Sequence, residues 1–116
     1  MNHEELVRTL AKPGQDICDS MSPDMMHNLH MAVGICGEAG ELIDAIKKAA
    51  VYNKTLDRDN VIEELGDLEF YMEGLRQQLK ISREETITNN ITKLLKRYKS
   101  GKFSDQEAQD RADKGV

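Results

Sequence analysis

The stretch VIEELGDLEFYMEGLRQQL, residues 61–79, has the periodicity of an amphipathic helix. At about 100° per residue its apolar side chains gather on one face. We expect that face to be buried, and it consists of Val61, Leu65, Leu68, Met72, Leu75 and Leu79. Glu64 points into the same face, where an unpaired ionised carboxylate would be costly. The acid must therefore lose its charge, pair with a base or bind a cation.

Glu64 belongs to one of two carboxylate pairs that have the same spacing. Glu64 and Asp67 form one pair, Glu38 and Glu41 form the other, and 22 residues separate the pairs. Residues three apart on a helix lie side by side, so each pair offers two carboxylates to one ion or to two neighbouring ions. Because acids make up 21 of the 116 residues, spacing alone is weak evidence. The buried position of Glu64 favours a cation, and an all-oxygen site suits Mg²⁺ or Mn²⁺ better than Zn²⁺.

Helix signals on both sides of these pairs predict an all-α fold. Ser22 and Pro23 open a helix from about residue 24 to 52, and a second helix, capped by Asp57 or Asp59, runs to about residue 79. A capping box at 82–85 opens a third helix, to about residue 100, before Gly101. Short helices are expected at both ends. One is an amphipathic turn in the first twelve residues that Pro13 and Gly14 end, and the other is opened by a capping box at 104–107.

Three glycines recur at every third position in the first long helix, namely Gly34, Gly37 and Gly40. Each costs about 1 kcal/mol relative to alanine in a helix interior. Close approach of another backbone or a ligand would offset this cost. A local break in the helix near Gly40 would explain the same residues equally well.

The composition favours a single helical domain over residues 1–116, with its core at about 22–108. The chain has only five aromatic residues and no Trp. Its three long helices carry apolar residues on more than one side, which predicts a bundle completed by oligomerisation. A net charge of −5 argues against general nucleic-acid binding. No apolar run approaches the roughly 20 residues that span a bilayer, and the two cysteines have no metal or disulfide spacing, so we expect a cytoplasmic protein without a membrane partner.

The third long helix supplies a polar and cationic row. Asn90, Lys93 and Arg97 follow one another at spacings of three and four, beside an apolar row that includes Tyr98. Such a row is able to reach phosphate oxygens. Alternatively, Lys93 and Arg97 merely pair with the acids of the chain or face solvent. Further acids near the C-terminus, Asp113 among them, are typical of solvated surface.

Three segments together resemble one known family: GEAGELIDAIKK at 37–48, IEELGDLEFYMEGL at 62–75 and NITKLLKRY at 90–98. They are similar to the MazG-like branch of the all-α nucleoside triphosphate pyrophosphohydrolases. The signature of that family is ExxE, a gap of variable length and then ExxD. The order and the 22-residue gap in this chain comply with it.

The resemblance implies a helical bundle in which Glu38, Glu41, Glu64 and Asp67 hold Mg²⁺. It implies hydrolysis of a nucleoside triphosphate between its α and β phosphates. It also implies assembly as a homodimer or homotetramer. Lys93 and Arg97 match phosphate-contacting bases, Asn90 matches a polar position near the substrate, and Tyr98 is a candidate for contacting the base.

Many members of this family have a further Glu directly before the first ExxE, where this chain has Gly37. If that acid helps to activate water, the task could pass here to Glu38 or to a metal-bound hydroxide. The other interpretation of the sequence is non-enzymatic: an acidic helical module that dimerises or regulates a partner.

Overall fold

The computed structural model describes residues 1–114, which form helices joined by short loops and contain no strand. The elements are α1 (His3–Leu10), α2 (Gly14–Ser20), α3 (Pro23–Tyr52), α4 (Arg58–Leu79), α5 (Arg83–Arg97), α6 (Asp105–Asp110) and the 3₁₀ helix η1 (Ala112–Lys114). The predicted all-α class with three long helices is confirmed. Contacts within the chain divide it into two compact units, residues 1–72 and the part from residue 73 onward, which are described separately.

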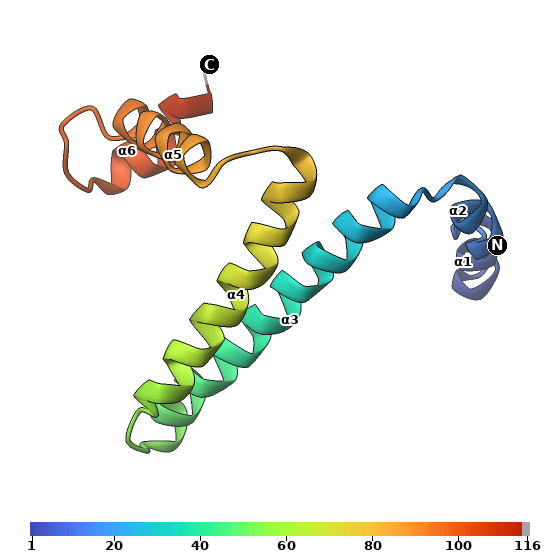
Figure 1. Cartoon of the computed structure of the whole chain (residues 1–116), viewed down its shortest axis with the longest axis horizontal. Coiled ribbons are helices and arrows are strands. Elements are labelled where there is room, and N and C mark those ends of the chain that lie inside the picture. The colour runs from blue at the N-terminus through green and yellow to red at the C-terminus, as the bar shows by residue number, and fades with distance from the viewer. Residues whose placement is uncertain (115–116) are drawn as a thin grey trace. The chain divides into compact units, whose positions relative to one another are not determined.

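Helices α3 and α4 form an antiparallel hairpin, drawn in Figure 1 from blue through green to yellow. Ser22 caps α3 by accepting a hydrogen bond from the Met25 backbone at 3.0 Å. The helix ends at Asn53, whose φ of 52° is left-handed, a conformation that asparagine tolerates better than most residues. Asp57 then accepts from the Asn60 backbone at 3.1 Å, which satisfies a donor at the start of α4.

Tight packing between these two helices occurs at Gly34. A Cβ atom at Gly34 would collide with the ring of Tyr71. The Tyr71 ring also forms an edge-type contact with the His30 ring, with ring centroids 6.2 Å apart. Helix α3 runs unbroken through all three glycines, so a close approach, and not a break, explains Gly34. Gly37 and Gly40 face open space.

The core between α3 and α4 is small. Among the described residues, only Met31 and Ala45 on α3 and Glu64 on α4 are buried as whole residues. The expectation that Leu65 and Leu79 are buried is wrong, because both are exposed. Helix α4 meets α3 along the line through Glu64 and Tyr71, and Leu65 lies about 100° around the helix from Glu64.

The outer face of α3 carries large exposed apolar side chains. Val33 and Ile43 are 60% and 66% exposed, and Leu29 and Val51 are also exposed. At about 100° per residue, these four side chains lie on the side of α3 away from Ala45. We call them the outer apolar face. None of the helices in residues 1–114 combines the length and the apolarity that crossing a bilayer requires.

Helix α2 was not expected from the sequence. Pro13 and Gly14 do follow the end of α1, but they also begin a new helix. The Pro13 carbonyl accepts from the backbone N–H groups of Asp16 and Ile17 at 3.1 and 3.3 Å. Proline lacks a side-chain acceptor, so this helix start carries none of the usual capping signal.

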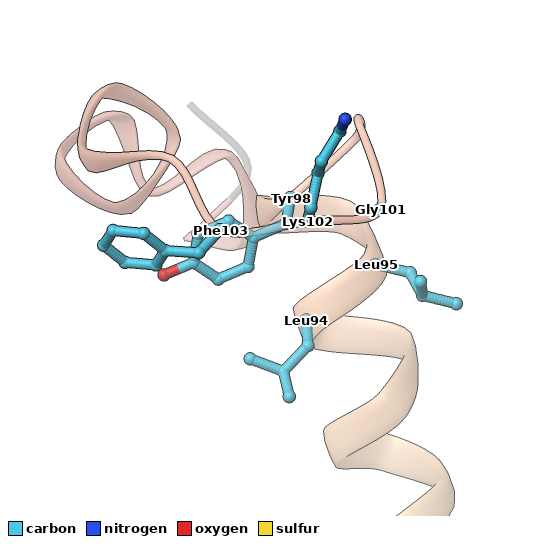
Figure 2. A pocket seen from close by; sticks show the side chains of 6 residues that line it. All are labelled: Leu94, Leu95, Tyr98, Gly101, Lys102 and Phe103. Atoms are coloured by element: carbon cyan, nitrogen blue, oxygen red, sulfur yellow. The ribbon is translucent and has the colours of Figure 1, made fainter.

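In the second unit, α5 begins at the predicted cap, where Ser82 accepts from the Glu85 backbone at 2.9 Å. The helix ends at Arg97, three residues earlier than expected, because the chain turns and Gly101 takes a φ of 77°. Ser104 caps α6 as predicted. This turn helps to form an apolar pocket of about 280 Å³ (Figure 2). It is lined by Leu94, Leu95, Tyr98, Gly101, Lys102 and Phe103.

Candidate metal centre

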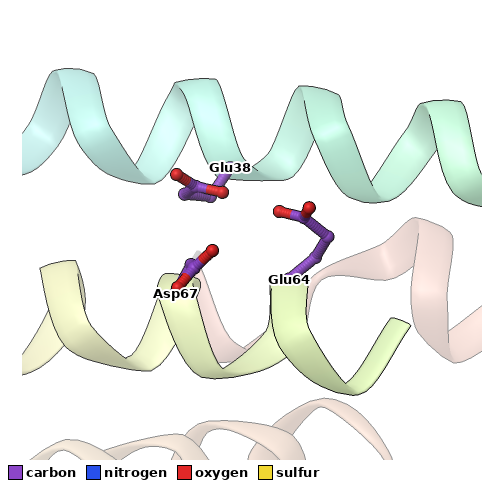
Figure 3. Close-up of side chains that lie close together, drawn as sticks. All are labelled: Glu38, Glu64 and Asp67. Atoms are coloured by element: carbon purple, nitrogen blue, oxygen red, sulfur yellow. The ribbon is translucent and has the colours of Figure 1, made fainter. Parts of the chain in front are cut away.

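Three carboxylates converge between α3 and α4. Glu38 comes from α3, and Glu64 and Asp67 come from successive turns of α4. One oxygen of each lies within 4.8 Å of the others, and Figure 3 shows the three groups pointing into the space between the two helices. Glu64 is only 9% exposed, whereas Glu38 and Asp67 are half-buried. The predicted burial of Glu64 is confirmed.

This crowding changes the protonation of Glu64. A hydrogen bond with the Glu38 carboxyl group, burial, and the charges of Glu38, Asp67 and Glu41 raise the pKa of Glu64 from 4.5 to about 7. Two carboxyl groups share a hydrogen bond only when one of them carries a proton. Near neutral pH, a proton therefore relieves the repulsion in the cluster.

A divalent cation could relieve the same repulsion. Oε2 of Glu64 is buried and has no hydrogen-bond partner among the described residues. A buried acceptor without a donor is costly, and a cation would satisfy it. The available donors are all carboxylate oxygens, the ligands that hard cations such as Mg²⁺ prefer. The cluster could hold a metal ion of this class.

The structure brings together three of the four predicted metal ligands. Glu41 is exposed and lies one turn along α3 from Glu38, outside the group of three. Its charge still contributes to the raised pKa of Glu64. Its role as a ligand stays a prediction.

The predicted substrate-binding residues belong to the second unit. Lys93, Arg97 and Tyr98 are half-buried, and Asn90 is exposed, on α5 and its C-terminal cap. Their place relative to the acidic cluster stays a prediction.

Arg97 has a partner that the sequence did not indicate. Its Nε and Nη2 atoms donate to Oδ1 and Oδ2 of Asp113 at 2.8 and 3.3 Å. The Asp113 side chain is 1% exposed, so its interpretation as solvated surface is wrong. Sixteen residues and a turn separate the two side chains, and no local spacing signals such a pair. Arg97 thus pairs with an acid of its own chain, and its contact with a substrate stays a prediction.

Comparison with known proteins adds evidence from most of the chain. The family model described as "MazG nucleotide pyrophosphohydrolase domain" matches residues 26–101. The Gene 37 protein of Mycobacterium phage L5 is 30% identical over 97 residues, which cover 80% of this chain and 82% of that protein. No solved structure matches the chain. The family match includes both carboxylate pairs and the cationic row of α5.

Proposed function

Since the chain belongs to the family of MazG nucleotide pyrophosphohydrolase domains, we propose that it is a Mg²⁺-dependent nucleoside triphosphate pyrophosphohydrolase. A water oxygen attacks the α phosphorus of a (d)NTP, and the bond to the oxygen that bridges to the β phosphorus breaks. The products are a (d)NMP and pyrophosphate. The observation that best supports this proposal is the carboxylate cluster around the buried Glu64.

Glu38, Glu41, Glu64 and Asp67 are the proposed ligands of Mg²⁺, for which Mn²⁺ could substitute. When bound, the ion would neutralise phosphate charge and make a coordinated water more acidic. With Gly37 in place of the additional Glu of the family, Glu38 is the candidate to accept a proton from the attacking water.

The cations of α5 would act on the triphosphate itself. Lys93 and Arg97 would stabilise the negative charge that develops on the departing pyrophosphate. Asn90 and Tyr98 would contact the nucleoside part. The substrate would come from the cytoplasmic nucleotide pool.

We further propose that the chain acts as a homodimer or homotetramer. The outer apolar face of α3 leaves Val33 and Ile43 more than half exposed, while only two apolar side chains are buried in residues 1–114. Association that covered this face would supply the core that the α3–α4 hairpin lacks. The same association is available to a non-enzymatic module, so it does not distinguish the two interpretations.

The decisive experiment is a screen of the eight common ribo- and deoxyribonucleoside triphosphates with Mg²⁺. The proposal expects pyrophosphate and no orthophosphate from at least one of them. Hydrolysis in ¹⁸O-labelled water should place the label in the monophosphate, because the α phosphorus is attacked. Label found only in the pyrophosphate would place the attack on the β phosphorus instead. Release of orthophosphate would contradict the proposed cleavage.

Two variants at neighbouring residues test whether the activity depends on the carboxylate cluster. Glu64→Gln should lower kcat/KM by on the order of 100-fold or more, as loss of a charge-stabilising group does. Glu63→Gln removes an equal charge from the exposed residue next to it and should leave kcat/KM unchanged. Equal loss in both variants would argue against the cluster. A wild type without activity towards any triphosphate would favour the non-enzymatic module.

A further inference from the structure

The Arg97–Asp113 pair joins the family region to a segment that lies outside it. Arg97 lies within the matched residues 26–101, whereas Asp113 belongs to η1, twelve residues beyond their end. Both carboxylate oxygens of Asp113 accept hydrogen bonds, and the two side chains are 17% and 1% exposed. This two-point geometry fixes both the position and the plane of the guanidinium group.

A second contact anchors the same C-terminal segment to the end of α5. The Ser100 hydroxyl donates to Oε1 of Glu107 at 2.8 Å, and Glu107 lies on α6 between the turn and η1. Arg111 adds a weaker ionic contact, with Nε 3.7 Å from Oδ1 of Asp113. The carboxylate of Asp113 is therefore held in place from more than one side.

The geometry also decides which donors of Arg97 remain for another anion. A guanidinium group has five N–H bonds in one plane. Asp113 takes the bond on Nε and one bond on Nη2, and the Tyr98 side chain also forms a hydrogen bond with the Arg97 side chain. The edge formed by Nη1 and the second bond of Nη2 faces away from this carboxylate, and such an edge matches two oxygens of a phosphate group. Lys93 lies one turn earlier in the same row of α5.

We propose that Asp113 is a positioning residue that aims Arg97 at the phosphates of the substrate. The proposal rests on the proposed function, because it needs Arg97 to contact the triphosphate. Under this proposal, the segment after residue 101, which lies outside the family match, contributes to substrate binding. Asp113 also stays ionised at working pH, since the hydrogen bond from Arg97 lowers its pKa to about 2.

Steady-state kinetics on the full chain test this role with Asp113→Asn, which keeps the shape of the side chain and removes its charge. We expect KM to rise and kcat/KM to fall by about 10- to 100-fold, as when a partner that orients a ligand is lost. Asp110→Asn removes an equal charge from the same segment and should match wild type. A fall in KM would mean that Asp113 competes with phosphate, and this result would overturn the proposal.

A double-mutant cycle separates positioning from simple structural support. If Asp113 acts through Arg97, then Arg97→Lys should lose at least as much activity as Asp113→Asn, and the double variant should lose no more. A purely structural role predicts additive losses, a lower melting temperature and an unchanged KM for the folded fraction. Additive losses would overturn the proposal. Asp113→Glu, which keeps the charge on a longer side chain, should recover part of the loss if Asp113→Asn proves poorly folded.

A binding measurement keeps the inference testable without catalysis. The Nε–H resonance of Arg97, identified by its absence in Arg97→Lys, should shift when inorganic tripolyphosphate and Mg²⁺ are added. Asp113→Asn should require about tenfold more tripolyphosphate for the same shift. If the enzyme is active but this resonance does not respond, the inference fails and the proposed function stands. If no nucleotide is hydrolysed but the resonance responds as expected, the proposed function fails and the positioning of Arg97 for polyphosphate stands.

Discussion

Among single residues, Glu64 affects both the stability of the chain and its proposed metal binding. Its carboxyl group lies where water has little access and two other acids are close. A proton and a divalent cation are alternative ways to neutralise this crowding. A site that is costly without metal gains the most from binding one, so the same repulsion favours metal binding.

The first prediction concerns the pH dependence of the metal-free protein. The folded-state pKa of Glu64 is about 7, above its ordinary value of 4.5, so the folded state binds more protons between these pH values. Stability should therefore fall as pH rises from about 4.5 to 7. Melting temperatures of wild type and Glu64→Gln in EDTA would measure this, and the variant should lack this fall. At pH 7.5, Mg²⁺ should raise the melting temperature of wild type only. Parallel profiles would contradict the prediction.

Asp113 should change the stability of the protein with pH in the opposite direction to Glu64. Its folded-state pKa of about 2 lies below the ordinary value of 3.8, so its ion pair stabilises the fold above pH 3.8 and is lost as pH falls towards 2. We expect the stability difference between wild type and Asp113→Asn to shrink over this range. Urea unfolding followed by circular dichroism at several pH values would measure it. A difference that stays constant down to pH 2 would mean that the pair does not form in solution.

Among the helices, α3 approaches α4 closely at Gly34 because glycine has no Cβ atom. Gly34→Ala should destabilise the protein by about 1–3 kcal/mol, because Cβ would overlap the ring of Tyr71. Gly37→Ala, one turn away on α3, meets no atom within 4 Å and should stabilise the helix by up to about 1 kcal/mol. Chemical denaturation of both variants measures the contrast. Equal effects would show that the hairpin does not pack at Gly34.

The helices also show what a sequence reveals locally. Ser22, Ser82 and Ser104 each cap a helix where they were predicted to, because capping depends on neighbouring residues only. Gly34 was recognised as unusual, but its cause lay on another helix, in the ring of Tyr71. Helix α2 was missed because its start uses the carbonyl of Pro13 and no side-chain cap.

At the scale of the whole molecule, the outer apolar face of α3 should govern assembly. Replacing both Val33 and Ile43 by Glu would put four charges into a twofold interface and should weaken association by on the order of 100-fold or more. Sedimentation velocity over a range of concentrations measures this change. The paired swap Val33→Ile with Ile43→Val keeps the apolar surface and should assemble like wild type. A wild type that is monomeric at all concentrations would contradict the proposed oligomer.

Some features of the candidate site could be predicted from the sequence and others could not, because only local features leave a pattern along the chain. Periodicity placed Glu64 inside an apolar face, and the structure confirms its burial and its meeting with Glu38 and Asp67. Periodicity could not find the partner of Arg97, since that contact depends on how the chain returns after Gly101. Contacts across a turn depend on the path of the chain in space, which spacing along one helix does not describe.

The position of Asp113 has a practical consequence for anyone who produces this protein. A recombinant version trimmed to the matched residues 26–101 would retain both acidic pairs and all of α5, yet it would leave the guanidinium of Arg97 without its carboxylate. We expect such a shortened protein to bind nucleotides weakly even if it binds metal, so an assay on it would underrate the activity that we propose for the full chain. Affinity tags are better attached at the N-terminus, because η1 comes close to the C-terminal end in the sequence.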